Sequence, residues 1–171
     1  SLALAQLGLG MLVIPQKPWS EVENELKAYR EIFQEVNGEP APPPIVVGFT
    51  FCHEDEERAR EMAAEYVGNY WDSIMNHYEF RSDHLKTTKG YEYYGNAADA
   101  IAGMGLEKMA EMYVGVNTYG TPAEVVEKLR HQREILGYDH DILMIAKYGS
   151  MSQEEAESST RLFAREVIPN L

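Results

Sequence analysis

The stretch Leu9-Gly10-Met11-Leu12-Val13-Ile14-Pro15 decides the class of fold. It is a short, continuous apolar run that shows no alternation of apolar and polar residues and ends at Pro15. Such a run is typical of a strand buried on both faces, as in parallel sheets. A helix-like segment, residues 1–7, precedes it. Because that segment lacks a strand before it, we expect the chain to begin inside an alternating β/α pattern.

Two further apolar runs have the same character. Ile45–Cys52 is rich in β-branched and aromatic residues, and residues 141–146 form a third run. Segments with helical periodicity separate the three runs. Three apolar strands with helices between them predict an α/β fold with a parallel sheet and right-handed crossovers.

Three Ser or Thr residues are each followed by a Glu three positions later, which is the spacing of a helix capping box. These pairs are Ser20/Glu23, Thr121/Glu124 and Ser152/Glu155. Pro122 strengthens the second pair, because proline is favoured at the first helical position. We therefore expect a helix to begin at each pair, and Asn37-Gly38 to end the first of these helices.

The segment between the second and third runs is unusually long. Residues 81–95 contain two glycines, three tyrosines and several charges, which favours an ordered loop. Residues 97–114 are rich in Met and small side chains and predict one or two short helices. We therefore expect a helical and loop insertion at residues 81–119, within a single domain that spans residues 1–171.

Composition narrows the class of function. The net charge of −13 over 171 residues argues against nucleic acid and anionic membranes as partners, because both require clustered cations. A small acidic ligand would need a local basic patch. The single Cys52 cannot form a disulfide within the chain, which favours a reducing, cytoplasmic location. No apolar run reaches the length of about 18 residues that a membrane span needs.

Three parts of the sequence resemble short patterns in a fixed order. They are Ser1–Pro15 (S-x-x-L-A-x-x-L-G-x-G), Tyr119–Val125 with Gly137–Asp141 (G-T-P-E-E-V, then G-x-D), and Phe163–Pro169 (F-A-R-E-V-x-P). Together they resemble the luciferase-like flavin-dependent monooxygenases, the bacterial luciferase superfamily. The resemblance implies a TIM-type (β/α)8 barrel that binds FMN or the deazaflavin F420. It also implies oxidation of a small organic substrate by reduced flavin with dioxygen or a hydride acceptor.

Such a barrel needs about 250 residues. This chain resembles only its last three β/α units, with the insertion before the last strand, so Leu9–Pro15 corresponds to the sixth barrel strand. We therefore expect the C-terminal half of an enzyme, inactive alone, whose open sheet associates with the N-terminal half or with further copies. The alternative is a truncated or companion barrel fragment that acts as a non-catalytic structural or interaction subunit.

Candidate site residues follow from the resemblance and from the rule that barrel sites lie at the carboxyl ends of strands. The resemblance implies that Ser1, at a helix start, contacts the flavin phosphate. The strand-end rule points to Gln16, Lys17, Cys52 and His53, and also to Lys147 and Tyr148. The aromatic loop adds Lys89, Tyr91 and Tyr94 as candidate pocket residues. For each of these, a packing or solvated surface role remains the alternative.

The residues give less support to two other kinds of site, a nucleophile and a metal site. Cys52 and His53 invite a nucleophile interpretation, but adjacent residues on a strand point to opposite faces, which favours a core thiol and a histidine at the helix entry. His77, Asp83 and His84 lack the spacing of a dedicated metal site, and the resemblance implies no metal. No catalytic side chain is assigned, because in this family the flavin performs the oxidation.

Overall fold

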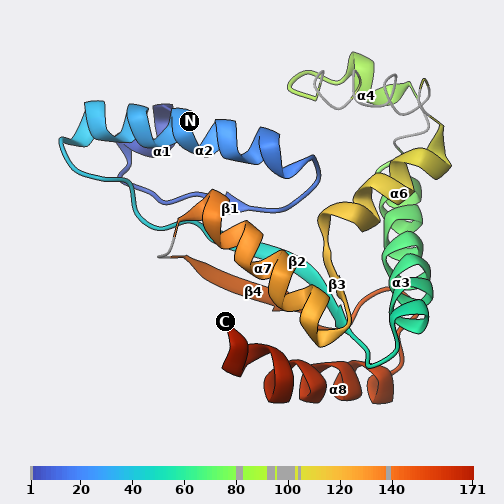
Figure 1. Ribbon diagram of the computed structural model, residues 1–171. Helices are drawn as coiled ribbons and strands as arrows, with labels where there is room; N and C mark the ends of the chain where they lie inside the picture. Colours follow the sequence, from blue (N-terminus) through green and yellow to red (C-terminus); the bar gives the residue numbers. More distant parts are fainter. Residues whose placement is uncertain (1, 80–82, 92–94, 96–102, 104, 138–139) are drawn as a thin grey trace.

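The computed structural model describes residues 2–79, 83–91, 95, 103, 105–137 and 140–171 (Figure 1). Helices and strands alternate along the chain, and all strand pairings are parallel, so the predicted α/β fold is confirmed. The elements are α1 (Leu2–Gln6), β1 (Leu12–Val13), α2 (Trp19–Asn37), β2 (Ile45–Cys52), α3 (Glu56–His77), α4 (His84–Thr87), α6 (Leu106–Val116), β3 (Thr118–Gly120), α7 (Pro122–Leu136), β4 (Asp141–Ile145), α8 (Gln153–Leu162), a π-helical turn at Phe163–Val167 and a 3-10 turn at Ile168–Asn170.

Strand β2 lies at the centre of the sheet and pairs with the other three strands. The N–H groups of Ile45 and His53 donate to the β1 and β3 segments, respectively. The Pro44 carbonyl accepts from the first residue of β4. Because backbone hydrogen bonds point alternately to the two sides of a strand, β1 and β3 share one edge of β2 and β4 takes the other.

Strand β3 corrects the prediction of three strands, since the described residues form four. It lies at the end of the segment expected to be an insertion, is three residues long and carries no apolar run. The preceding Asn117 extends its pairing. Its side-chain oxygen accepts the Phe49 N–H at 3.1 Å, and its amide nitrogen donates to the Tyr113 carbonyl at 2.7 Å. The Asn117 side chain therefore accepts a β2 backbone hydrogen bond that a backbone carbonyl of a neighbouring strand would normally accept.

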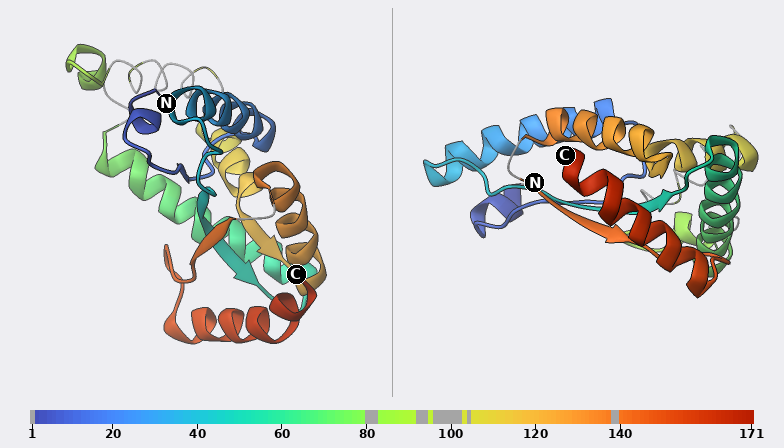
Figure 2. Two further views of the ribbon diagram at one scale, coloured as in Figure 1. Left: turned by 90° about the vertical axis from the view of Figure 1, so that its left-hand side faces the viewer. Right: turned by 60° about the horizontal axis from the view of Figure 1, so that its bottom comes forward.

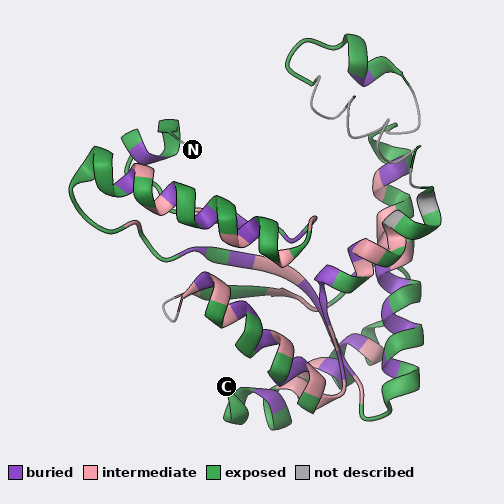
Figure 3. Ribbon diagram, turned by 45° about the horizontal axis from the view of Figure 1, so that its top comes forward, coloured by how far each residue is buried: buried purple, intermediate pink, exposed green. Residues whose placement is uncertain are grey.

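The expectation that β1 and β4 are buried on both faces is wrong. In β1, Val13 is buried but Leu12 is 56% exposed. In β4, Leu143 is 54% exposed. The reason is the register: Leu12 pairs with Ile45, and Leu143 pairs with the residue two positions further along β2, so their side chains share one face. No described helix covers that face at this end of the sheet. We call Leu12, Ile14, Ile45 and Leu143 the open sheet face (Figure 3).

The opposite sheet face is covered by α2 and α7. Val13 and Val46 pack there against Val22, Leu26 and Leu136. Helix α8 and the turn after it pack against α7 at the end of β2. Helices α3 and α6 run side by side as an arm that carries α4 away from the sheet (Figure 2).

Two of the three predicted capping boxes are present. Thr121/Glu124 opens α7 and Ser152/Glu155 opens α8, each with both reciprocal hydrogen bonds. The third is wrong, because α2 already begins at Trp19, behind Pro18 and without a side-chain cap. The Trp19 indole N–H donates to the Val116 carbonyl at 3.2 Å, which anchors this earlier start. Gly38 ends α2 in the left-handed conformation (φ 74°), as predicted.

Candidate functional site

The carboxyl end of β2 meets α8, and Cys52 lies at this junction. Cys52 is 2% exposed, packs against α7 and α8, and donates its backbone N–H to the Ser159 hydroxyl at 2.9 Å. Burial, with a smaller contribution from the Glu166 carboxylate, raises the pKa of its thiol to about 11. A thiol with this pKa is almost wholly protonated at neutral pH, so Cys52 is a core residue and not an activated nucleophile.

His53 belongs to the turn that leads into α3. Its ring Nδ1 accepts the Asp55 N–H at 3.0 Å, and the Asp55 carboxylate in turn accepts the Arg58 N–H at 2.8 Å as the N-cap of α3. The ring stacks on Phe51, with centroids 6.4 Å apart. The histidine is thus held by the helix entry and is partly buried.

A cavity of about 240 Å³ opens where β2 ends beside α8. Its lining includes two of the predicted pocket residues and comprises Phe51, Cys52, His53, Met62, Glu154, Glu155, Ser158 and Ser159. The pKa of Glu155 is lowered, first by the hydrogen bond from the Tyr66 hydroxyl and then by the hydrogen bonds from Ser152. An ionised rim of this kind disfavours a phosphate. The volume is also below the range of about 300–1,000 Å³ that ligand pockets usually span.

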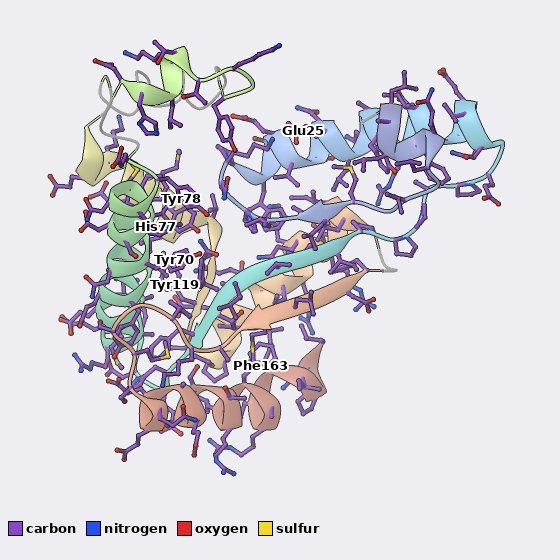
Figure 4. The ribbon with its side chains drawn as sticks, turned by 180° about the vertical axis from the view of Figure 1, so that it is seen from behind. Glu25, Tyr70, His77, Tyr78, Tyr119 and Phe163 are labelled. Atoms are coloured by element: carbon purple, nitrogen blue, oxygen red, sulfur yellow. The ribbon has the colours of Figure 1, made fainter. Side chains whose placement is uncertain are left out.

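The other described candidates lie elsewhere. Gln16 is exposed, and Lys17 forms an ion pair with Glu25 of α2, which Figure 4 labels. Lys89 and Tyr91 are exposed residues that follow α4, on the arm and away from the sheet (Figure 1). None of these four lines the cavity beside Cys52. Ser1 and Tyr94 lie outside the described residues.

An aromatic cluster was not predicted. It lies on the same side of the sheet as the open sheet face. Phe49 of β2 packs against Tyr70 of α3 at 4.5 Å and against Tyr148 at 4.6 Å between ring centroids. Figure 4 shows Tyr70 extending from α3 toward the sheet. Trp71 and Tyr113 continue the cluster at 5.0 Å. Tyr148 is one of the residues to which the strand-end rule points, and the other signal in the sequence is a tyrosine at helical spacing on α3.

Two polar atoms in this aromatic cluster have no hydrogen-bond partner among the described residues. They are the Tyr148 hydroxyl and the Trp71 indole nitrogen, and both are buried. Burial, with a smaller contribution from Tyr66, raises the pKa of Tyr148, so its hydroxyl stays protonated and can donate. Most buried polar groups in folded proteins are paired. Two buried donors without a described partner are therefore candidate hydrogen-bond donors to a ligand.

No three His, Cys, Asp or Glu side chains gather as a possible metal site in the part of the chain that the structure describes. His77 instead packs edge-on against Tyr78 at 5.4 Å. His84 lies 3.7 Å from a Glu79 carboxylate oxygen. Among the same residues, no helix combines the length and apolarity that crossing a membrane requires.

Solved structures share this fold. A monooxygenase, RslO1 from Streptomyces bottropensis, superposes with a TM-score of 0.63 at 23% identity, over 98% of this chain and 44% of its own. The oxygenating constituent of 3,6-diketocamphane monooxygenase from Pseudomonas putida, solved in complex with FMN, gives a TM-score of 0.62 at 18% identity, over 99% and 45% of the two chains.

Curated relatives point the same way. The alkanal monooxygenase alpha chains of Photobacterium leiognathi and Aliivibrio fischeri are each 24% identical to this chain over 98% of its length. The chain spans about half the length of these relatives, 48% in both cases. The family description "luciferase-like monooxygenase" matches residues 3–140. The chain therefore belongs to the luciferase-like monooxygenase family.

Proposed function

We propose that the chain is the C-terminal half of a flavin-dependent monooxygenase with a TIM-type barrel, which oxidises a small organic substrate. The observation that carries this proposal is the pair of unpaired buried donors, Tyr148 and Trp71, in the aromatic cluster. The isoalloxazine ring of a flavin is planar, aromatic and rich in carbonyl and nitrogen acceptors, which match these two donors and the surrounding aromatic rings in chemical kind. We propose FMN as the cofactor, supported by the fold shared with a monooxygenase solved in complex with FMN.

When bound, the flavin would supply the redox chemistry. The chain would supply the surroundings. Phe49 and Tyr113 would form an apolar wall that excludes water, since both are buried. The Tyr148 hydroxyl and the Trp71 N–H would donate to ring acceptors and fix the orientation of the ring. Because the pKa of Tyr148 is raised, that hydroxyl would orient the ring without giving up its proton.

The open sheet face gives the second part of the proposal. Half-exposed apolar side chains on one face of a sheet are a docking surface, and we propose that the N-terminal half of the barrel covers them. Two observations support this: the chain spans 48% of the relatives' length, and the outer edge of β4 pairs with no described strand. Ser1 would contribute to the flavin phosphate site, and Gln16, Lys17, Cys52, His53, Lys89, Tyr91 and Tyr94 to the substrate pocket. A cytoplasmic location completes this proposal.

Titration with flavin tests the cofactor. The 171-residue chain is mixed with FMN or with F420, and binding is followed by quenching of the fluorescence of the flavin and by visible circular dichroism. We expect FMN to bind, and Tyr148→Phe to weaken its affinity about tenfold, the value of one buried hydrogen bond. Tyr119→Phe is the matched control, because the Tyr119 hydroxyl makes no hydrogen bond to a described residue.

Three results would change the proposal. Binding of F420 in place of FMN would replace the cofactor and keep the enzyme class. Equal affinities of the wild type and Tyr148→Phe would remove Tyr148 from the site. Binding of neither flavin would favour the second candidate, a non-catalytic structural or interaction subunit. The specific observation behind that candidate is the open sheet face, which is suited to association whether or not a flavin binds.

A further inference from the structure

A second cavity, of about 300 Å³, lies between the carboxyl end of β4 and α8. It is lined by Ala146, Lys147, Gln153, Ala156, Glu157, Thr160 and Arg161. None of these residues lines the cavity beside Cys52. The α8 residues of the two cavities alternate at helical spacing, so the cavities lie on two different faces of the same helix. We call the cavity lined by Lys147 and Arg161 the β4–α8 cleft.

The β4–α8 cleft brings two cations together in a chain of net charge −13. Lys147 lies two residues beyond the end of β4, and Arg161 lies in the last turn of α8. An arginine in a last helical turn is favoured by the helix dipole on its own account. That effect does not explain a lysine from a different element in the same cleft. The pair is therefore the local basic patch that an acidic ligand would need.

Hydrogen bonds within the β4–α8 cleft leave Arg161 available. The Lys147 ammonium donates to the Gln153 side-chain oxygen at 3.3 Å, and the Gln153 amide donates to the Glu157 carboxylate at 3.1 Å. Glu157 keeps its charge, so the lining of the cleft carries two cations and one carboxylate, and its net charge is positive. Arg161 makes no hydrogen bond or ion pair with any residue that the structure describes. Its planar guanidinium can accept a carboxylate or phosphate in two parallel hydrogen bonds.

The β4–α8 cleft is apolar between its cations. The side chains of Ala146 and Ala156 are methyl groups, and the Thr160 hydroxyl donates its hydrogen bond to the Ala156 carbonyl at 2.7 Å. A ligand held there would place an oxyanion on the cations and an uncharged body against the alanines. The volume is at the lower end of the range for ligand pockets, which is too small for a whole flavin.

We propose that the β4–α8 cleft binds a small organic oxyanion, a carboxylate or a phosphate monoester on a short apolar body. Arg161 is the bidentate contact and Lys147 the second charge. This site is separate from the flavin site of the proposed function, because none of the aromatic side chains Phe49, Tyr113 and Tyr148 lines it, although Ala156 of the cleft packs in the same core cluster.

Calorimetric titration of the 171-residue chain at low salt tests this site. The probes are benzoate, phenyl phosphate, inorganic phosphate and the neutral benzyl alcohol. We expect benzoate or phenyl phosphate to bind, and Arg161→Gln to weaken that binding about tenfold, the loss of a charge-assisted hydrogen-bonded pair. Lys147→Gln should weaken it less, because its ammonium is a single point charge. Arg60→Gln, which removes an exposed cation paired with Glu56, is the matched control and should change nothing.

Each outcome decides. Binding of benzoate alone assigns a carboxylate, and binding of phenyl phosphate alone assigns a phosphate ester. Equal affinity for inorganic phosphate and phenyl phosphate overturns the proposal, because contact of the apolar body with Ala146 and Ala156 would then contribute nothing to the affinity. Absence of binding, tight binding of benzyl alcohol, or no effect of Arg161→Gln overturns it as well. An FMN titration of Arg161→Gln should match that of the wild type, so failure here is separable from failure of the flavin proposal.

Discussion

The Tyr66 hydroxyl donates a hydrogen bond of 2.6 Å to the Glu155 carboxylate and so ties the middle of α3 to the first turn of α8. The same carboxylate accepts the Ser152 N–H at 2.8 Å in the capping box. One side chain therefore both starts α8 and holds it against α3. This contact fixes the wall of the cavity beside Cys52, since Glu155 lines that cavity.

Tyr66→Phe should lower the free energy of unfolding by about 1–2 kcal/mol, because hydrogen bonds to charged acceptors contribute more than neutral ones. Urea denaturation followed by circular dichroism measures the change. Tyr119→Phe removes a hydroxyl that makes no hydrogen bond to a described residue and should stay within about 0.5 kcal/mol of the wild type. Equal effects of the two substitutions would show that the Tyr66–Glu155 contact contributes nothing to stability.

Stability should fall in acid. The pKa values of Glu124 and Glu155 are lowered in the folded chain, Glu124 first by the hydrogen bond from the Thr121 backbone and Glu155 first by that from Tyr66. A lowered folded pKa means that the stabilisation is complete above the unfolded value, about 4.3, and disappears as the pH falls through the folded value. Urea midpoints measured from pH 7 to pH 3 should therefore decline below about pH 4. In Glu124→Gln the decline should be shallower, and an unchanged slope would contradict the assignment.

Cys52 should react slowly with thiol reagents. With a pKa of about 11, the thiolate fraction at pH 8 is about 0.1%, roughly 200-fold below that of a free cysteine. Burial slows the reaction further. Alkylation by iodoacetamide, read by mass spectrometry, should be slow in buffer and complete in about 8 M urea, where the chain is unfolded and the thiol is exposed. Fast labelling of the folded chain would restore Cys52 as a candidate nucleophile.

The sequence predicted what local chemistry decides. Thr121 and Ser152 carry their own helix-start signal, and Gly38 its stop signal, so these boundaries are confirmed. Ser20 carries the same signal, but Pro18 and the tertiary contact of Trp19 start the helix earlier. A helix boundary predicted from local sequence is wrong where a contact with a residue distant in the sequence stabilises a different boundary.

The parts that were missed depend on long-range contacts. Strand β3 has no apolar run and exists because Asn117 and β2 pair with each other. The aromatic cluster joins Phe49, Tyr70 and Tyr148, which lie on three different elements. Leu143 is exposed because the helices cover the other face of the sheet. The sequence of one strand does not indicate which face the helices will cover. The family resemblance was confirmed because it depends on the order of segments and not on any one of them.

Asn117→Leu should be among the most destabilising substitutions outside the apolar core. Asn117 is 4% exposed, and its amide satisfies both the Phe49 N–H and the Tyr113 carbonyl. Leucine has nearly the same size and leaves both backbone groups buried without a partner, at a cost of about 1–3 kcal/mol each. Urea denaturation should show a loss of about 2–4 kcal/mol. Tyr119→Phe is the control, because the Tyr119 hydroxyl makes no hydrogen bond to a described residue, and it should stay within about 0.5 kcal/mol of the wild type.

Leu143→Glu should change association while leaving folding intact. Leu143 is 54% exposed on the open sheet face, so a charge there stays hydrated, and the free energy of unfolding should change by less than about 0.5 kcal/mol. The same charge on a surface that another chain must cover would be desolvated at a large cost.

In the wild type, the average molar mass measured by light scattering should rise with protein concentration, because the open sheet face is apolar. Leu143→Glu should remain monomeric over that range. Leu7→Glu, which adds the same charge to a leucine that is 71% exposed outside the open sheet face, should associate as the wild type does. A monomeric wild type, or equal behaviour of the two variants, would show that the open sheet face is not a docking surface.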